Sequence, residues 1–218
     1  MKRLINIISI ITILSLLFSG CSQNGKDSKG IALSEKHLHL TMIGTAQDDP
    51  VSLAAKKGAE EEVEKLMKKY SKLDITFDWK APEMADHIAQ RLLLINSIYN
   101  GTDMVIISCL DTIVMKEAIH MSAEMGIPVI TYDSDVPLSE RIAYIGADHF
   151  QTGKKLVYDI ALLNKGGKIA VLAGSEKLYK HQRQLEGIHD ALKDHPQLEV
   201  VDVIYHDESP EGAINALK

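Results

Sequence analysis

The sequence alternates between short apolar segments and longer amphipathic segments, and this alternation restricts the fold more than any other feature. Apolar runs of strand length recur from residue 37 to residue 206, and stretches with apolar residues at helical spacing lie between them. The run from Asp103 to Ser108 lacks polar alternation, which is typical of a parallel strand covered on both faces. Repeated strand–helix units of this length predict doubly wound parallel sheets of the α/β class.

The expected elements follow one another in a regular order. We predict strands over residues 37–45, 73–79, 103–108, 127–133, 141–147, 168–173 and 198–206. We predict helices over residues 53–70, 151–163 and 176–193, with a further one beginning near Pro210. Asp111 is expected to be the N-cap of a helix that ends at Gly126. Pro82 is expected to open a helix whose inward face carries Met84, Ile88, Leu92 and Ile95.

Ligands of open parallel sheets bind beyond the carboxyl ends of the strands. In this chain that rule selects four loops, at residues 45–52, 108–111, 133–136 and 174–184. We therefore expect the side chains that hold a ligand to lie in these loops.

The N-terminus has the layout of a secretory signal. Lys2 and Arg3 precede an uncharged, mostly apolar run over residues 4–18, and small residues follow it. The run is too short to cross a bilayer comfortably, because a spanning helix needs roughly 20 apolar residues. The pattern predicts export from the cytoplasm.

The sequence LFSGC over residues 17–21 resembles the lipobox of bacterial lipoproteins, although Phe18 stands where leucine is usual. The resemblance implies a lipoprotein signal peptide over residues 1–20. It also implies that Cys21 carries acyl chains such as palmitate, which anchor the protein on the outer face or periplasmic side of the cell membrane. A plain signal peptide with a chance cysteine is the alternative. Residues 21–36 are mostly small and polar, and are predicted to form a tether.

Charge and cysteine content exclude several classes. The formal charge of −6 becomes −8 without Lys2 and Arg3, and no basic stripe is present for nucleic acid. If Cys21 is lipidated, Cys109 is the single cysteine left, and no intramolecular disulfide can form. The exported domain must then be stabilised by its apolar core.

Several segments, in this order along the chain, resemble the ribose-type periplasmic sugar-binding proteins. They are Ile43-Gly44, Asp49-Pro50, Gly58-Ala59-Glu60, the IPVITYD sequence of residues 127–133, the IGADH sequence of residues 145–149 with Gly153, residues 168–174, and Glu186-Gly187. The resemblance implies a type I periplasmic binding protein fold, in which two Rossmann-like lobes close by a hinge over a small polar ligand. It implies an N-terminal lobe over residues 37–145 and a partial C-terminal lobe over residues 146–218. In that family roughly another hundred residues complete the second lobe, and we expect the chain to be a fragment or a truncated product.

Asp133 is the leading candidate for ligand binding. It stands at the carboxyl end of an expected buried strand, and the resemblance implies that its carboxylate accepts hydrogen bonds from ligand hydroxyls. A role as helix cap or turn residue is the alternative. Ser134 is the second candidate, in a position where ribose binders usually carry arginine.

The family's Asn-Pro-Phe-Phe loop is replaced here by Asp49, Pro50, Val51 and Ser52. Aromatic residues in that loop stack on the apolar face of a sugar ring, and their absence argues against a simple pyranose or furanose ligand. Asp49 can offer an acceptor to the ligand, or act as a turn residue before proline. Val51 and Ser52 complete this candidate set.

The second lobe contributes two candidates by resemblance. Gln184 stands three residues before Gly187, where the family carries a ligand-binding arginine. Arg183 is one position away, and a shift of one residue rotates a helical side chain by about 100°. Either residue is a candidate for this contact.

Other reactive residues favour structural roles. Cys109 lies near the expected cleft but has no evident activating base, so a buried or cleft-lining role is favoured over a nucleophile. His37 and His39 share one strand face without further metal ligands in the pattern, which favours a solvated edge strand. No metal or cofactor is expected.

The sequence raises three hypotheses for the function. The resemblance and the export signal together imply a solute-binding lipoprotein that delivers a small polar ligand, a sugar or sugar-like compound, to an ABC importer. The alternative is a receptor of the same fold that signals to a membrane histidine kinase or chemoreceptor. An enzyme on a flavodoxin-like frame would need a phosphate loop, an activated nucleophile or a metal cluster, and the sequence shows none of these patterns.

Overall fold

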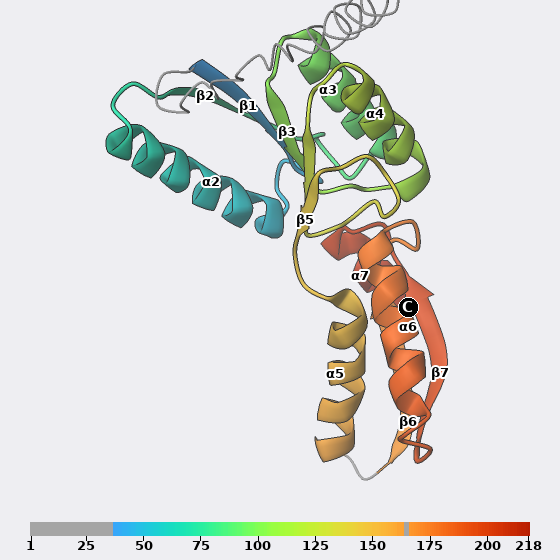
Figure 1. The fold of residues 1–218 in the computed structure, drawn as a ribbon. Helices are drawn as coiled ribbons and strands as arrows, with labels where there is room; N and C mark the ends of the chain where they lie inside the picture. The colour runs from blue at the N-terminus through green and yellow to red at the C-terminus, as the bar shows by residue number, and fades with distance from the viewer. Residues whose placement is uncertain (1–36, 164–165) are drawn as a thin grey trace, which may run out of the picture.

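The computed structural model describes residues 37–163 and 166–218, which form two α/β parts (Figure 1). The first part holds a five-stranded parallel sheet with strand order β2-β1-β3-β4-β5, and the second holds a parallel pair, β6-β7. The predicted α/β class with parallel sheets is confirmed. The predicted signal peptide, Cys21 and the tether lie outside the described residues.

The elements keep the predicted alternation. The strands are β1 (His37–Ile43), β2 (Asp74–Lys80), β3 (Met104–Ile107), β4 (Val129–Tyr132), β5 (Ala143–Ile145), β6 (Gly167–Ala173) and β7 (Leu198–Tyr205). The helices are α2 (Pro50–Lys69), α3 (His87–Tyr99), α4 (Thr112–Glu124), α5 (His149–Leu163), α6 (Tyr179–Leu192) and α7 (Pro210–Ala216). The first part comprises β1 to β5 with α2 to α4, and the second comprises the remaining elements.

Aspartate side chains begin the three helices α2, α3 and α4. The carboxylates of Asp49, Asp86 and Asp111 each accept hydrogen bonds from two backbone N–H groups of the first helical turn. An N-cap of this kind contributes about 1 kcal/mol. The predicted cap at Asp111 is confirmed, and the Asp49 cap starts α2 three residues earlier than predicted.

The helix predicted to begin at Pro82 begins later, and that prediction is wrong. Asp86 supplies the cap, so α3 starts at His87 and its inward face is rotated from the predicted one. Three residues predicted to point inward are exposed: Met84 at 76%, Ile88 at 52% and Leu92 at 51%. The buried face carries Gln90, Leu94, Ser97 and Ile98.

The prediction that His37 and His39 lie on an edge strand is also wrong. β1 lies between β2 and β3, because the chain reverses direction across the sheet after β2. Each ring pairs with an aspartate of β2, His37 Nδ1 at 2.7 Å from Asp74 and His39 Nε2 at 3.0 Å from Asp78. Both rings therefore have a carboxylate partner on the neighbouring strand.

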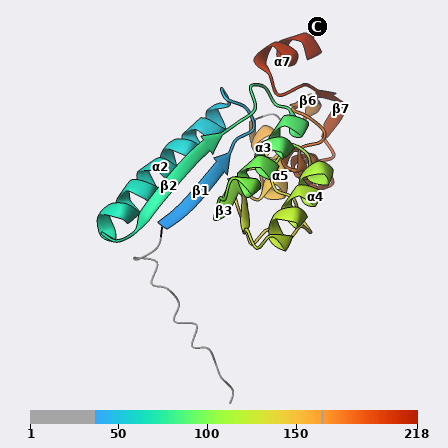
Figure 2. The ribbon, with the colours of Figure 1, turned by 90° about the horizontal axis from the view of Figure 1, so that it is seen from above.

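Helices cover both faces of the first sheet. α2 lies on one side, and α3 and α4 lie on the other (Figures 1 and 2). This placement follows from right-handed crossovers, since the chain moves one way across the sheet after β1 and the opposite way after β2. The main core, between the sheet and α3 and α4, consists of Ile43, Leu94, Ile98, Val105, Ile107, Cys109, Met115, Ala118, Ile119, Val129 and Val136.

The second part has its own apolar core. Val157 of α5, Ile188 and Ala191 of α6, and Leu198 of β7 are buried together. This part extends away from the first along α5 and α6 (Figure 1). Across both described stretches of the chain, no helix combines the length and apolarity needed to span a membrane.

Candidate ligand-binding site

A cavity of about 620 Å³ lies where the two parts face each other. This volume falls within the range of about 300–1,000 Å³ that is common for small-molecule sites. The loops that follow β1, β2 and β3 line one side, and the loops after β6 and β7 line the other. The lining residues are Thr45, Ala46, Asp48, Asp49, Pro50, Met84, Ala85, Leu110, Leu178, Lys180, His206, Asp207, Glu208, Ser209, Pro210 and Ala213.

Three of the four loops selected from the sequence contribute to this lining, at residues 45–52, 108–111 and 174–184. The loops after β2 and β7 also contribute, and the sequence reasoning missed them. The same rule could have found both, because each follows the carboxyl end of a predicted parallel strand.

The Asp133 carboxylate lies between the two parts. Its Oδ2 is 2.8 Å from Nζ of Lys180, a cavity-lining residue, and 3.5 Å from Oγ of Ser108. The side chains of Asp133 and Lys180 are 22% and 17% exposed, so this ion pair is largely shielded from water. Asp133 itself is not among the lining residues, but its carboxylate is bound to Lys180, which is one of them.

The backbone of Asp133 is held in an unusual conformation. Its φ of 53° is left-handed, which aspartate tolerates better than most residues. The carbonyl oxygen accepts hydrogen bonds from the Tyr144 hydroxyl at 2.9 Å and from Nε2 of His149 at 2.7 Å. Because Tyr144 lies in β5 and His149 opens α5, these contacts tie Asp133 to the segment that joins the two parts.

The loop before α2 is a closed hydrogen-bond network. Oδ2 of Asp49 accepts from the Thr45 hydroxyl and the Ser52 N–H, both at 2.8 Å. Burial acts to raise the pKa of Asp49, but these hydrogen bonds outweigh it and lower that pKa. The Ser52 hydroxyl is buried beside Thr45 and Tyr132, whereas the Val51 side chain is exposed. Burial raises the pKa of Tyr132 to about 12, which keeps its hydroxyl neutral.

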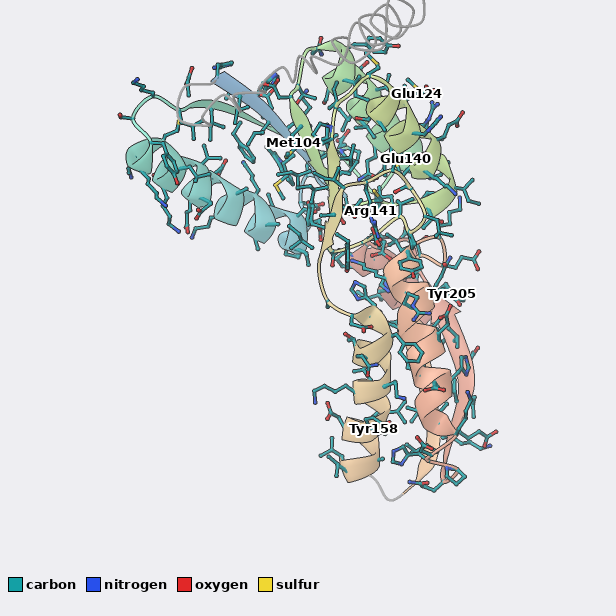
Figure 3. All side chains as sticks on the ribbon, in the orientation of Figure 1. Met104, Glu124, Glu140, Arg141, Tyr158 and Tyr205 are labelled. Carbon is teal, nitrogen blue, oxygen red and sulfur yellow. The ribbon has the colours of Figure 1, made fainter. Side chains whose placement is uncertain are left out.

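The loop after β4 is fixed by a partly buried ion pair between Asp135 and Arg141. Asp135 accepts from both Nε and Nη of Arg141 and, at 2.6 Å, from the Thr131 hydroxyl. Figure 3 shows Arg141 where the two parts meet. Ser134 is fully buried, its carbonyl accepts from the Cys109 N–H at 3.1 Å, and its hydroxyl has no partner among the described residues.

The two candidates of the second part point to other side chains. Gln184 Oε1 lies 3.2 Å from Nδ1 of His181. The Arg183 guanidinium pairs with Glu186 and lies 4.9 Å from the centre of the Phe150 ring. Neither residue belongs to the described lining, and the structure does not bring them together with Asp133.

Glu208 lines the cavity and was not among the residues predicted from the sequence. Its Oε1 accepts from the Ser175 N–H and lies 3.1 Å from Nε2 of His181. A Cβ at position 174 would lie 1.7 Å from this oxygen, so Gly174 makes the close approach possible. Burial acts to raise the pKa of Glu208, but the hydrogen bonds from His181 and Ser175 outweigh it and lower the pKa.

The lining is acidic. It carries four carboxylates, of Asp48, Asp49, Asp207 and Glu208, and a single ammonium group, that of Lys180. A phosphate or carboxylate ligand would meet like charges on most sides, which costs free energy. The arrangement therefore argues against an anionic ligand.

Cys109 is a buried core residue. The Cys109 thiol is 1% exposed, and burial raises its pKa far above the ordinary value, so little thiolate forms. Among the described residues, no group of three or more histidine, cysteine, aspartate or glutamate side chains is arranged to hold a metal ion.

Comparison with known proteins places this geometry in a family. A family model described as periplasmic binding protein domain matches residues 40–218. The ribose import binding protein of Bacillus subtilis (strain 168) is 24% identical over 195 residues, which are 87% of this chain and 60% of that protein.

Two solved structures show the same fold. An ABC transporter solute-binding protein from Burkholderia graminis C4D1M, in complex with D-arabinose, has a TM-score of 0.76 and 23% identity, and the match covers 84% of this chain and 61% of that one. A glucose-galactose binding protein from Geobacillus stearothermophilus has a TM-score of 0.71 and 22% identity, with 77% and 58% covered. The chain thus spans about three fifths of the length of these relatives. The match of the family model over most of the chain shows that the protein belongs to the periplasmic binding protein family, with the type I fold of its sugar-binding members.

Proposed function

We propose that this protein is an extracytoplasmic solute-binding lipoprotein that captures a sugar or sugar-like compound between its two parts. The cavity of about 620 Å³, lined from both parts by loops at the carboxyl ends of their strands, carries the proposal. The protein then delivers its ligand to an ABC importer, and Cys21 anchors it to the cell membrane. It binds the ligand without changing it chemically.

Within this site, Asp133 is the acceptor for ligand hydroxyls. Its carboxylate is held at the junction of the two parts by Lys180, and its backbone by Tyr144 and His149. Asp49 lines the cavity, Ser52 is buried and donates its N–H to Asp49, and Ser134 is buried in the loop after β4. Val51, Arg183 and Gln184 remain candidates for contacts that form when the two parts move relative to each other.

A thermal-shift screen of the purified full chain tests the proposal. The panel contains D-ribose, D-arabinose, D-galactose, D-glucose and L-rhamnose, together with sugar alcohols and autoinducer-like furanosyl compounds, and D-ribose 5-phosphate as an anionic compound of similar size. A ligand at 100 times its dissociation constant adds about 2.7 kcal/mol to the free energy of unfolding, which raises the melting temperature measurably. We expect a neutral sugar to raise it and the phosphate to leave it unchanged.

Two variants provide the matched comparison. Asp133→Asn keeps a residue that tolerates the left-handed conformation but removes the charge, and should abolish the shift. Asp159→Asn removes a carboxylate that pairs with Lys155 on the exposed face of α5, and should preserve it. If no neutral compound of the panel stabilises the unsubstituted chain, the proposal of a sugar or sugar-like ligand is wrong.

The choice between import and sensing needs a cellular measurement. In the sensing alternative, the protein reports its ligand to a membrane histidine kinase or chemoreceptor. Uptake of the radiolabelled sugar should fall in cells that lack the gene and return when it is restored. Unchanged uptake together with loss of a sugar-dependent response would favour the sensing receptor.

A further inference from the structure

Lys180 has a position that the family resemblance did not assign. It lies in the first turn of α6 and is the one lysine or arginine in the described lining of the cavity. Its Nζ reaches 2.8 Å across the junction to Oδ2 of Asp133, 47 residues earlier in the chain. The ion pair thus joins the two parts directly at the cavity.

The pair retains hydrogen-bonding capacity for a ligand. A lysine ammonium has three N–H donors, and within the described residues the ammonium of Lys180 makes one hydrogen bond, to Asp133. On Asp133, Oδ2 accepts from Lys180 and Ser108, and Oδ1 has no partner in the described part of the chain. Donors and an acceptor therefore lie next to each other, as two neighbouring hydroxyls of a polyol require.

Other polar side chains of α6 are engaged elsewhere. Arg183 pairs with Glu186, while His181 contacts both Gln184 and Glu208. Lys180 is the polar residue of this helix that lines the cavity. Its single charge among four lining carboxylates does not create a site for an anion.

We propose that Lys180 is the specificity-determining ligand contact of the second part. This inference rests on the proposed function. Lys180 holds the Asp133 carboxylate when the site is empty. When a ligand enters, Lys180 donates to one hydroxyl while a neighbouring hydroxyl donates to Oδ1 of Asp133. The ligand class is an uncharged polyol with two adjacent hydroxyl groups.

The test measures the dissociation constant of the panel sugar that gives the largest thermal shift, using Lys180→Met in the full chain. Loss of a charge-assisted hydrogen bond should weaken binding about tenfold or more. Lys180→Arg, which keeps the charge and the donors, should bind more tightly than Lys180→Met. Lys177→Met removes an exposed lysine three positions away, outside the lining, and should bind like the unsubstituted chain.

Monodeoxy analogues of that sugar separate direct contact from a structural role. Removing the hydroxyl that Lys180 contacts should weaken binding to the unsubstituted chain, and should have much less effect on Lys180→Met. If every analogue loses the same factor in both proteins, Lys180 does not touch the ligand and the inference is wrong. If Lys180→Met does not fold, Lys180→Gln, which is neutral but still polar, takes its place.

The outcomes separate the two proposals. If the unsubstituted chain binds a sugar and Lys180→Met binds it equally well, the inference fails while the proposed function stands. If the unsubstituted chain binds none of the sugars, both fail together. Weakened binding with the analogue-specific pattern supports both.

Discussion

Gln90 illustrates how single residues shape the cavity wall. Its side chain is fully buried, and its Nε2 donates to the carbonyl oxygens of Gly44 at 2.9 Å and Ser108 at 2.7 Å. Its Oε1 accepts from the Leu110 N–H at 3.0 Å. One amide therefore ties together the carboxyl ends of β1 and β3, from which two of the lining loops depart.

We expect Gln90→Leu to lower the free energy of unfolding by about 3 kcal/mol. Leucine has a volume close to that of glutamine, but it cannot form the three hydrogen bonds of Gln90. Two carbonyls and one N–H are then buried without these partners, and each such group costs about 1–3 kcal/mol before the structure relaxes. Urea unfolding measures the change. Gln151→Leu, at an exposed position on α5, should change it by less than about 0.5 kcal/mol. A similar small change for Gln90→Leu would show that this network is dispensable.

The Asp135–Arg141 pair predicts an acid-dependent stability. Burial acts to raise the pKa of Asp135, but the hydrogen bonds from Arg141 and Thr131 outweigh it and lower that pKa below 3.8. A carboxyl with a lower pKa in the folded state stabilises the fold above its unfolded pKa. This contribution is lost as the pH falls below about 4, through the folded pKa.

Chemical unfolding between pH 7 and pH 2.5 should therefore show a fall in stability below about pH 4. Asp135→Asn should be less stable at pH 7 and should show a shallower fall. Asp202→Asn replaces an exposed carboxylate of β7 and should leave the profile nearly unchanged. Identical acid profiles for Asp135→Asn and the unsubstituted chain would contradict the assignment.

At the scale of elements, α5 and α6 approach each other through two glycines. A Cβ at Gly153 would lie 2.0 Å from the carbonyl oxygen of Gln184, and one at Gly187 would lie 2.0 Å from that of Phe150. Neither backbone can move away without opening the core around Val157. Tyr158 lies toward the end of α5 that is remote from the first part (Figure 3). Gly153 precedes Tyr158 in α5, so the close approach of the two helices lies nearer the first part.

Gly187→Ala should therefore destabilise the protein by about 1–3 kcal/mol, as overpacking does in tight interiors. Gly58→Ala makes the same chemical change in α2, where no atom lies within 4 Å of the added Cβ. That variant should gain about 0.5–1 kcal/mol, because alanine favours a helix more than glycine does. Urea unfolding of both variants measures whether the free energy of unfolding falls for Gly187→Ala and rises for Gly58→Ala. Equal changes in both variants would show that the close contact between α5 and α6 is not the cause.

At the scale of the whole molecule, we propose that a lipid anchor at Cys21 holds the protein at the membrane, while the two folded parts bind the ligand. The LFSGC sequence predicts acylation at Cys21, and residues 21–36 would connect the anchor to β1. Each buried methylene contributes about 0.8 kcal/mol to membrane attachment, so several acyl chains at Cys21 would hold the protein durably.

We expect Cys21→Ser to abolish incorporation of radiolabelled palmitate and to remove the mature protein from the washed membrane fraction. Cys109→Ser, at a buried position in the main core, is the matched control and should retain the label. Persistent labelling of Cys21→Ser would contradict lipidation at this residue.

Much of the fold was predictable because local physics encodes it. Alternating periodicity located the strands, and Asp111 marked its helix correctly, since capping depends on neighbouring residues alone. The predicted start of α3 was wrong because Pro82 and Asp86 can each begin a helix as far as their neighbouring residues are concerned. The helix begins after Asp86, and with this start Leu94 and Ile98 pack in the main core.

The sequence by itself determined the α/β class, the order of the elements and three of the loops that line the cavity, because hydrophobic periodicity and the strand-end rule operate over short stretches. Only the tertiary structure decided that β1 is an interior strand, that Glu208 joins the site, and that Lys180 meets Asp133. The pair Lys180–Asp133 joins residues 47 positions apart, one in α6 and the other directly after β4, and no local pattern specifies such a contact. It depends on how the segment from β5 to α5 sets one part against the other.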